Sequence, residues 1–383
     1  MEKINIAIVG AGAVGCAVAL ELAGRGKKDI FIFERGKYLA EGQSGRNSGV
    51  IHAGLYYKEG SLKARLCVSG NLLLYEFCAK HDVPAVKTGK LVAATNQDEE
   101  GRVAALFERA KRNGADSVKL VGREEIKRLE PNIESSLALY SPSTGSVDAA
   151  TYVKTLARLC EANGAQILMR SAVIGIEPKG GSFIVSVRRS DGKLESVEAD
   201  VVINSAGLYS DKVAKMVDPK FSHALAPLRG EYFKFNKARR SNINMKGLNV
   251  YPAPEYVVAD GVAVEVVGIH LTPTFGLTAS GELGISNIVT VGPEFTAVTD
   301  REDYESNRKP ASLFHEKAKR FFPNLLASDL EPDFTGIMAN MGTGMDWLIE
   351  KCPAHPACVQ LVGIDSPALT ASLAIAKYVA DIL

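Results

Sequence analysis

The chain has 383 residues, with 45 lysines and arginines against 44 aspartates and glutamates, which gives a formal net charge of +1. Hydrophobic residues make up 46% of the chain and charged residues 23%, values that exclude a disordered low-complexity chain. The balanced charge excludes a broad surface for polyanions, so no nucleic-acid partner is expected. The length predicts two or three domains, each large enough to bury its own core.

The sequence favours a cytoplasmic protein. No apolar run reaches the roughly 18 residues that a membrane span needs, so no transmembrane segment is expected. The six cysteines are widely scattered, which is typical of a reducing compartment. Met1–Lys3 leads directly into an apolar run, and this is not the pattern of a signal peptide.

The first 34 residues predict a βαβ unit. An apolar strand at Ile4–Val9 leads into the glycine-rich turn Gly10–Gly15, and an apolar helix follows at Cys16–Leu22. A second apolar strand, Asp29–Phe33, ends at Glu34. A strand, a glycine turn, a helix and a second strand in this order are typical of dinucleotide-binding folds.

The glycine turn has the spacing Gly10-x-Gly12-x-x-Gly15. Glycines permit a tight turn and a close approach of the backbone, and the free N–H groups of the following helix suit a pyrophosphate. Glu34 lies 19 residues after Gly15, where its carboxylate can bind ribose hydroxyls. We therefore predict a bound dinucleotide. The alternative is a glycine turn that only packs the helix on the strand.

Further elements follow along the chain. Amphipathic patterns predict helices, and β-rich runs between turn residues predict strands. The predicted helices are Leu62–Lys80, Glu99–Asn113, Ala149–Ala162, Pro310–Phe322 and Ser366–Asp381. The predicted strands are Lys90–Thr95, Gln166–Met169, Ala172–Glu177, Phe183–Arg188, Val197–Asn204, Glu231–Phe235, Val262–Leu271 and Val359–Ile364.

The segment Gln43–Tyr57 is too rich in glycine, serine and asparagine for a core element. It predicts a loop that lays backbone and small side chains along an extended ligand. Nicotinamide-binding proteins rarely need a second segment of this kind so early in the chain, so it favours FAD over NAD.

The same segment is the first of five that carry a family resemblance. These segments are Ser44–Tyr57, Asn204–Asp211, Pro227–Tyr232, Gly268–Pro273 and Gly363–Ala374. Together they closely resemble L-2-hydroxyglutarate dehydrogenases (oxidases), which are FAD enzymes of the D-amino-acid-oxidase-like (DAO) superfamily. The matches run in family order from residue 4 to residue 380.

The resemblance implies an α/β (α+β) fold with a Rossmann-like FAD-binding domain interleaved with a mostly antiparallel β-sheet substrate domain. We expect residues 1–85, 145–220 and 335–383 in the first domain, and 86–144 and 221–334 in the second. The residues predicted to contact FAD are Gly10, Gly12, Ala13, Gly15, Glu34, Arg35, Ser44, Arg46, Asn47, Ser48, Gly49, Ala206, Gly207, Pro367, Leu369 and Thr370.

The implied activity is FAD-dependent oxidation of a small 2-hydroxy acid, L-2-hydroxyglutarate, to 2-oxoglutarate, with hydride transfer to flavin N5. His52 and His270 lie in family-like segments, and an imidazole suits the acceptance of the hydroxyl proton. A buried structural histidine is the alternative for each, and a covalent bond between His52 and flavin is a further one.

Four residues are predicted to bind substrate: Arg229, Tyr232, Tyr57 and Arg46. A guanidinium can bind a carboxylate through two hydrogen bonds, and tyrosine hydroxyls can donate to one, although packing is the commoner role of a tyrosine. The family usually carries an arginine in a Gly-Ile-Arg-Pro segment, where this chain has Met338. Because Met338 carries no charge, another cationic residue is expected to bind the substrate carboxylate.

Other functions stay open at this point. A related oxidoreductase could act on glycerol-3-phosphate or on an amino acid or amine. An NAD-dependent dehydrogenase and a non-catalytic flavin-binding protein are more distant alternatives. The electron acceptor could be oxygen, a quinone or an electron-transfer protein, and a quinone would imply peripheral contact with the inner membrane. Cys352, His355 and Cys358 resemble a metal or disulfide knot, but they offer only three ligands, so no metal is predicted.

Overall fold

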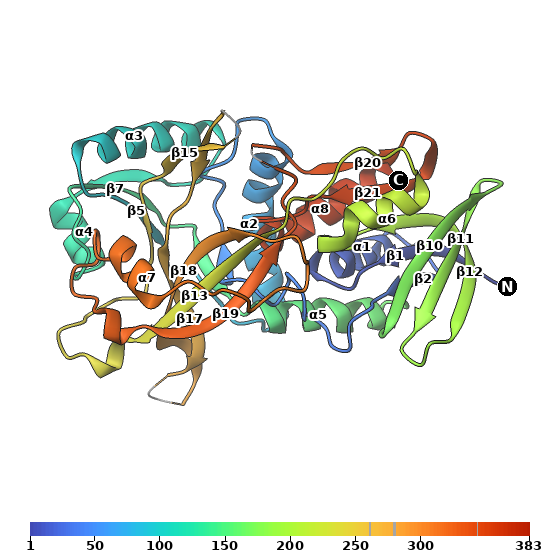
Figure 1. The fold of residues 1–383 in the computed structure, drawn as a ribbon, viewed down its shortest axis with the longest axis horizontal. Coiled ribbons are helices and arrows are strands. Elements are labelled where there is room, and N and C mark those ends of the chain that lie inside the picture. The colour runs from blue at the N-terminus through green and yellow to red at the C-terminus, as the bar shows by residue number, and fades with distance from the viewer. Residues whose placement is uncertain (260–261, 279–280, 343) are drawn as a thin grey trace. The chain divides into compact units, whose positions relative to one another are not determined.

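The structure, a computed structural model, describes residues 1–259, 262–278, 281–342 and 344–383. The chain forms two compact units, each built from segments that are far apart in the sequence (Figure 1). Unit 1 comprises Met1–Arg46, Ala149–Leu228 and Ile337–Leu383, and unit 2 comprises Asn47–Asp148 and Arg229–Gly336. Residues 47–85, which the sequence analysis assigned to the first domain, therefore lie in unit 2.

Unit 1 is built on an eight-stranded sheet. Its strand order is β10-β11-β12-β1-β2-β9, and the hairpin of β20 and β21 joins it through β12. The central pairs β12–β1, β1–β2, β2–β9 and β12–β21 are parallel, whereas β10, β11 and β12 form an antiparallel meander. The strands are β1 (Glu2–Val9), β2 (Ile30–Phe33), β9 (Gln166–Leu168), β10 (Ser171–Lys179), β11 (Ser182–Arg189), β12 (Leu194–Asn204), β20 (Leu348–Cys352) and β21 (His355–Val362).

Helices in unit 1 pack on one another and on this sheet. Helix α1 (Ala13–Gly24) contacts α5 (Ala149–Ala162) and α8 (Ala368–Ile382), and Figure 1 shows α1 and α8 side by side. The buried residues of α1 are mostly alanine, glycine and valine, which lets the neighbouring helices approach closely. A short helix, α6 (Ser210–Val217), packs on β10 and β21 after the 3₁₀ turn η1 (Gly207–Tyr209).

Unit 2 contains a second eight-stranded sheet with the order β19-β13-β18-β17-β14-β5-β7-β6. The pair β14–β5 is parallel, while β14–β17, β17–β18, β5–β7 and β6–β7 are antiparallel. The strands of this sheet are β5 (Lys90–Ala94), β6 (Lys119–Gly122), β7 (Leu137–Ser141), β13 (Leu228–Asn236), β14 (Asn249–Pro252), β17 (His270–Leu277), β18 (Leu283–Ala297) and β19 (Glu331–Met338). Two small sheets hold β3 (Val50–Ile51), β4 (Ala85–Val86) and β8 (Gly145–Val147), and β15 (Glu255–Ala259) and β16 (Val262–Val266).

One face of the large sheet in unit 2 carries one core cluster, and residues on the other face, such as Val92 and Tyr251, belong to a second cluster. Phe233 and Phe235 on β13 pack in the first cluster with Phe314, Phe321 and Phe322. The helices of this unit are α2 (Leu62–Lys80), α3 (Gln97–Arg112), α4 (Arg123–Leu129) and α7 (Ala311–Ala318), and the short 3₁₀ turns are η2 (Lys237–Arg239) and η3 (Ala327–Asp329). Both long helices begin at a capping side chain, because Ser61 Oγ accepts from Ala64 N–H and Asn96 Oδ1 accepts from Glu99 N–H.

The mixed α/β fold class is confirmed, and the predicted boundaries of α2 and α5 are those of the structure. One predicted strand is wrong. The run Val262–Leu271 is divided, since β16 ends at Val266 and β17 begins at His270 in a different sheet. Gly268, between the two strands, interrupts the β-rich run, and glycine weakens a strand interior.

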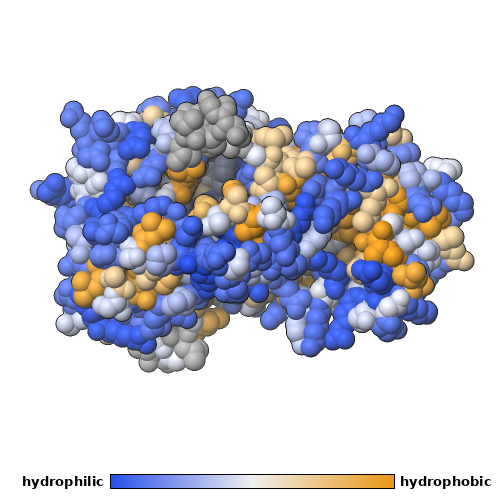
Figure 2. All heavy atoms as spheres, viewed as in Figure 1, coloured by the Kyte–Doolittle hydropathy of each residue, from blue (hydrophilic) through white to orange (hydrophobic). Residues whose placement is uncertain are grey.

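Hydrophilic residues predominate on the face shown in Figure 2, and apolar residues form separate small groups among them. Across the described residues, no helix is both long and apolar enough to cross a membrane.

Candidate functional site

The turn between β1 and α1 requires glycine for steric reasons. Gly10 has φ +102°, and a Cβ there would lie 2.7 Å from the backbone oxygen of Ser205. A Cβ on Gly15 would lie 2.0 Å from the backbone oxygen of Gly10. Helix α1 begins after Gly12, and no side chain caps it from that position. The turn thus leaves open backbone at a helix N-terminus, and this arrangement fits the pyrophosphate of a dinucleotide.

Two side chains hold this turn in place. The Glu34 carboxylate accepts hydrogen bonds from Ala11 N–H at 2.8 Å and from Gly36 N–H at 2.7 Å. The Ser44 hydroxyl accepts from Ala13 N–H at 3.0 Å, which is one of the first N–H groups of α1. Glu34 is only half-buried, so its carboxylate can still accept hydrogen bonds from ribose hydroxyls.

The other predicted FAD contacts in unit 1 surround the same turn in sequence-distant segments. Ala206 N–H donates to Asn204 Oδ1, and Gly207 has φ +53° where η1 begins. Thr370 is buried near the start of α8, which packs along α1. Arg35 lies with its guanidinium 3.9 Å from the centroid of the Tyr209 ring. Pro367 is buried and Leu369 half-buried at the same end of α8.

The glycine- and serine-rich loop continues from unit 1 into unit 2. Arg46 is half-buried, and its Nε donates to the backbone oxygen of Glu41. Asn47 Oδ1 accepts from Gly49 N–H, and a Cβ on Gly49 would lie 2.5 Å from the backbone oxygen of Val147. The Ser48 side chain hydrogen bonds to Tyr232. The loop therefore has a defined fold, in which Arg46, Asn47 and Ser48 each form a hydrogen bond.

The sheet of unit 2 carries polar groups on the face opposite the Phe233–Phe235 core. Successive side chains of a strand point to opposite faces. Leu91, Val250 and Leu271 belong to the core, so Lys90, Tyr251 and His270, each one position away, lie on the other face. The pairing of β5 with β14 and of β14 with β17 brings these three residues together.

We call His52, Lys90, Tyr251 and His270 the lysine cluster. The Lys90 ammonium lies 3.6 Å from the centroid of the Tyr251 ring, and the His270 ring stacks on Tyr251 with centroids 3.7 Å apart and an interplanar angle of 13°. His52, on the segment after β3, interacts electrostatically with both Lys90 and His270. Lys90 is 1% exposed and His270 is 6% exposed, so the cluster is largely removed from water.

Burial also determines the charges in the cluster. It lowers the pKa of Lys90 to about 7. It lowers the pKa of His270 to about 3, and the charge of Lys90 acts in the same direction. Burial, and then Lys90 and His270, lower the pKa of His52 well below its ordinary value. Both histidines are therefore neutral at pH 7 and can accept a proton.

The hydrogen bond of His270 favours one tautomer. Its Nδ1 lies 3.0 Å from the backbone oxygen of Gly268, and an oxygen of this kind can only accept. The proton of the neutral ring is therefore assigned to Nδ1, which leaves the lone pair on Nε2. Sequence reasoning selected both histidines but missed Lys90 and Tyr251. A lysine directly before the apolar run Leu91–Ala94 was the available signal.

Arg229, which the sequence predicts to bind a substrate carboxylate, is surrounded by acidic groups of the protein itself. It shares strand parity with Phe233 and therefore points to the core side of the sheet. Its guanidinium forms ion pairs with Glu231 at 3.1 Å and Asp303 at 3.1 Å and donates to the backbone oxygen of Ser306 at 2.5 Å. These groups occupy both terminal nitrogens, while Nε has no hydrogen-bond partner among the described residues. Because the charge of Arg229 is already compensated by Glu231 and Asp303, we propose a structural role for it in place of carboxylate binding.

Three further tyrosines of unit 2 differ in their surroundings. Tyr232 has the parity opposite to Arg229 and stacks on Phe334 with centroids 4.4 Å apart. Tyr57 is half-buried, and its backbone oxygen accepts from Asn113. Tyr56 stacks beside Tyr251 at 6.4 Å, and its hydroxyl is buried without a hydrogen-bond partner among the described residues. A buried hydroxyl without a partner needs an explanation, and a bound ligand would supply one.

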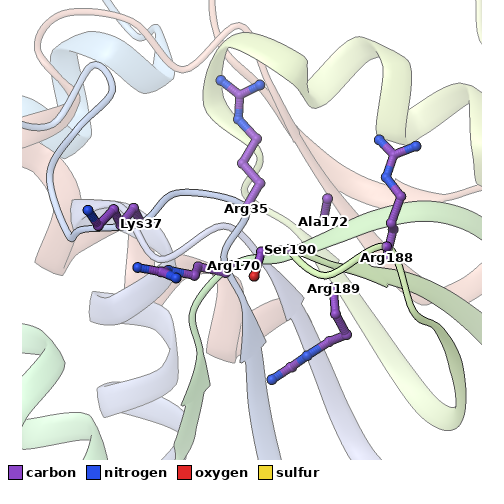
Figure 3. A pocket seen from close by; sticks show the side chains of 8 residues that line it. Arg35, Lys37, Arg170, Ala172, Arg188, Arg189 and Ser190 are labelled. Atoms are coloured by element: carbon purple, nitrogen blue, oxygen red, sulfur yellow. The ribbon is translucent and has the colours of Figure 1, made fainter.

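A basic hollow of about 560 Å³ lies in unit 1, near the segment after Glu34. Figure 3 shows that its cationic side chains point in different directions and do not converge on one point. The hollow lacks the apolar walls that enclose a small substrate, so we assign no substrate to it. It is lined by Arg35, Lys37, Arg170, Ala172, Arg188, Arg189, Ser190 and Gly192.

The Cys352–Cys358 segment forms the tight hairpin of β20 and β21, in which Cys352 pairs with His355. Both cysteines belong to the core of unit 1, together with Phe183 and Val202. Among the residues that the structure describes, no group of three or more histidine, cysteine, aspartate or glutamate side chains could hold a metal ion.

Comparisons with known proteins agree with this geometry. A family model described as FAD dependent oxidoreductase (DAO) matches residues 5–382. The chain is 31% identical to a mitochondrial L-2-hydroxyglutarate dehydrogenase of Caenorhabditis briggsae, covering 99% of this chain and 93% of the relative. It is 29% identical to an L-2-hydroxyglutarate dehydrogenase of Indibacter alkaliphilus, covering 98% of both. A solved FAD-bound L-alpha-glycerophosphate oxidase of Mycoplasma pneumoniae is 25% identical, with a TM-score of 0.84 over 100% of this chain and 95% of that one.

Proposed function

Because this chain belongs to the DAO family of FAD-dependent oxidoreductases, we propose that it oxidises L-2-hydroxyglutarate to 2-oxoglutarate. The similarity to L-2-hydroxyglutarate dehydrogenases over nearly the whole chain is the observation that carries this proposal. The lysine cluster supports it, since a buried cation and two neutral histidines suit an anionic substrate whose hydroxyl must lose a proton.

The residues of unit 1 fit FAD. We propose that the Gly10–Gly15 turn holds the pyrophosphate and that Glu34 holds the ribose, because the turn admits no Cβ at its first and last glycines. FAD, when bound, supplies an acceptor at flavin N5 for the hydride that leaves the substrate carbon. The protein contributes binding, orientation and the acceptor for the hydroxyl proton.

We propose His270 as the general base. Its Nδ1–H is directed to the Gly268 carbonyl, so Nε2 keeps the lone pair that a hydroxyl proton needs. The nearby Lys90 charge disfavours the protonated imidazole before substrate binds. A substrate carboxylate beside Lys90 would neutralise this charge and raise the proton affinity of His270 when the substrate is present. His52 is the alternative base in the same cluster.

The test is the visible spectrum of the purified holoenzyme before and after anaerobic addition of L-2-hydroxyglutarate. Bleaching of the flavin spectrum, with formation of one 2-oxoglutarate per flavin, is the expected result. A flavin that stays oxidised would exclude this substrate. Reoxidation of the bleached enzyme by oxygen, by a soluble quinone or by an electron-transfer flavoprotein then identifies its acceptor.

A second substrate belongs in the same assay. The structural similarity to an L-alpha-glycerophosphate oxidase favours glycerol-3-phosphate, which is also an anion that loses a hydride from a carbon bearing a hydroxyl. D- and L-amino acids complete the panel, because the superfamily resemblance includes oxidases of amines. The proposal requires that L-2-hydroxyglutarate reduces the flavin faster than either class at equal concentration.

A further inference from the structure

Lys90 is buried without a counter-ion. Its side chain is 1% exposed on the polar face of the unit 2 sheet. In the part of the chain that the structure describes, no acidic side chain forms an ion pair with it, and its cationic contacts are the rings of Tyr251 at 3.6 Å and Tyr56 at 5.6 Å. A buried charge is normally paired, so an unpaired ammonium of this kind is unfavourable for folding and needs another explanation.

The groups around Lys90 leave its charge uncompensated. Cys67, from α2, is a fully buried thiol whose pKa burial raises to about 12, so it carries no negative charge at pH 7. Burial also raises the pKa of Tyr56 and of Tyr251. His270 and His52 are neutral for the reasons given above. Within the lysine cluster, the protonated form of Lys90 is therefore the only cation, and an anion bound beside it would stabilise that form against its lowered pKa of about 7.

A second observation points to a ligand at this place. The hydroxyl of Tyr56 is buried and has no hydrogen-bond partner among the described residues. Its ring stacks beside Tyr251, whose ring lies under the Lys90 ammonium. The Lys90 ammonium lies 5.6 Å from the centroid of the Tyr56 ring, and the charges that act on the Tyr56 hydroxyl are those of Glu265 and Arg109. A buried cation and an unpaired hydroxyl donor on neighbouring side chains are the groups that bind a carboxylate.

We propose that the Lys90 ammonium is the counter-ion for a substrate carboxylate. Lys90 would thereby supply the cation that the family places where this chain has Met338, and Tyr251 would hold the ammonium in place by its ring face. This proposal deepens the proposed function and rests on it for the identity of the substrate. It concerns binding, since the carboxylate takes no part in the bond changes of the reaction.

The test compares Lys90→Met with Lys87→Met. The first variant removes the buried charge at nearly constant side-chain length, and the second makes the same substitution at an exposed lysine three residues earlier. The dissociation constant of 2-oxoglutarate is measured on each FAD-loaded enzyme from the change in flavin absorbance. We expect a rise of about thirtyfold or more for Lys90→Met and a change of less than about twofold for Lys87→Met.

Each outcome decides something. An unchanged dissociation constant in Lys90→Met overturns the proposal, and if both Lys90→Met and Lys90→Gln fail to fold with FAD, the lysine is structural and the proposal is also overturned. A wild type that binds 2-oxoglutarate but is not reduced by L-2-hydroxyglutarate removes the proposed reaction, while weaker binding by Lys90→Met still supports the carboxylate site. A wild type that does not bind 2-oxoglutarate overturns both proposals.

Discussion

The ring of Tyr251 lies between the Lys90 ammonium and the His270 imidazole. The ammonium is 3.6 Å and the imidazole centroid 3.7 Å from the centroid of this ring, and two groups at these distances cannot share one ring face. The aromatic ring therefore separates a cation from the proposed base while it contacts both. A change at Tyr251 should therefore disturb both groups.

Loss of His270 should slow the reaction more than it weakens binding. In His270→Gln, the side chain keeps a polar group but loses the imidazole that would accept the proton. We expect the rate of anaerobic flavin reduction by L-2-hydroxyglutarate to fall by roughly 10² to 10⁴, with a change of less than about threefold in the 2-oxoglutarate dissociation constant. Stopped-flow absorbance measures both quantities.

His52→Gln is the paired variant for this experiment. If His270 is the base, His52→Gln should retain a substantially faster reduction rate than His270→Gln. The reverse order would transfer the role of base to His52. Equally small decreases of the reduction rate in both variants would mean that neither histidine is the base.

Gly15→Ala should abolish FAD retention. The added Cβ would lie 2.0 Å from the Gly10 backbone oxygen, and only a shift of the turn itself can relieve this overlap. Gly24→Ala, at the other end of α1, is the matched control, because a Cβ there meets nothing within 4 Å. We expect stoichiometric flavin after gel filtration of Gly24→Ala and colourless protein for Gly15→Ala. Yellow, fully loaded Gly15→Ala would contradict the placement of the pyrophosphate.

Arg229→Met should destabilise the protein without affecting ligand binding. The substitution leaves Glu231, which is 0% exposed, without its closest cation, so we expect a loss of about 3 to 5 kcal/mol in the free energy of unfolding. Arg239→Met removes an exposed ion pair with Glu331 and should change stability by about 1 kcal/mol or less. Urea titration compares the variants. A selective loss of 2-oxoglutarate affinity in folded Arg229→Met would restore the substrate role that the sequence suggested.

The sequence predicted features that depend on neighbouring residues better than features that depend on strand pairing. The glycine turn and Glu34 are local to one βαβ unit, and their spacing alone indicates what they do. The sequence did not show that Arg229 and Tyr232 lie on opposite faces of the sheet. Alternation along a strand separates the two residues, but it does not tell which face packs on the core. Lys90 and Tyr251 are 161 positions apart in the sequence and meet only through the parallel pairing of β5 with β14. No pattern of neighbouring residues predicts a pairing between strands so far apart in the sequence.

The unpaired charge of Lys90 predicts an unusual dependence of stability on pH. Its folded-state pKa of about 7 is below the ordinary value of 10.5, so between these values the unfolded chain binds more protons than the folded one. The contribution of Lys90 to the free energy of unfolding therefore rises with pH across that window. Below pH 7 the folded state carries the full cost of the buried charge. Lys90→Met removes the penalty, which is at most about 4 to 5 kcal/mol by the linkage relation.

We therefore expect the FAD-loaded Lys90→Met variant to melt at a higher temperature than the wild type at pH 6, and the difference to shrink steadily towards pH 10. The comparison is made between the two proteins at each pH, because groups that titrate equally in both then cancel. Lys87→Met should show no gap that varies with pH. A constant difference between wild type and Lys90→Met would mean that Lys90 is charged in the fold at all these pH values, and hence that a partner compensates its charge.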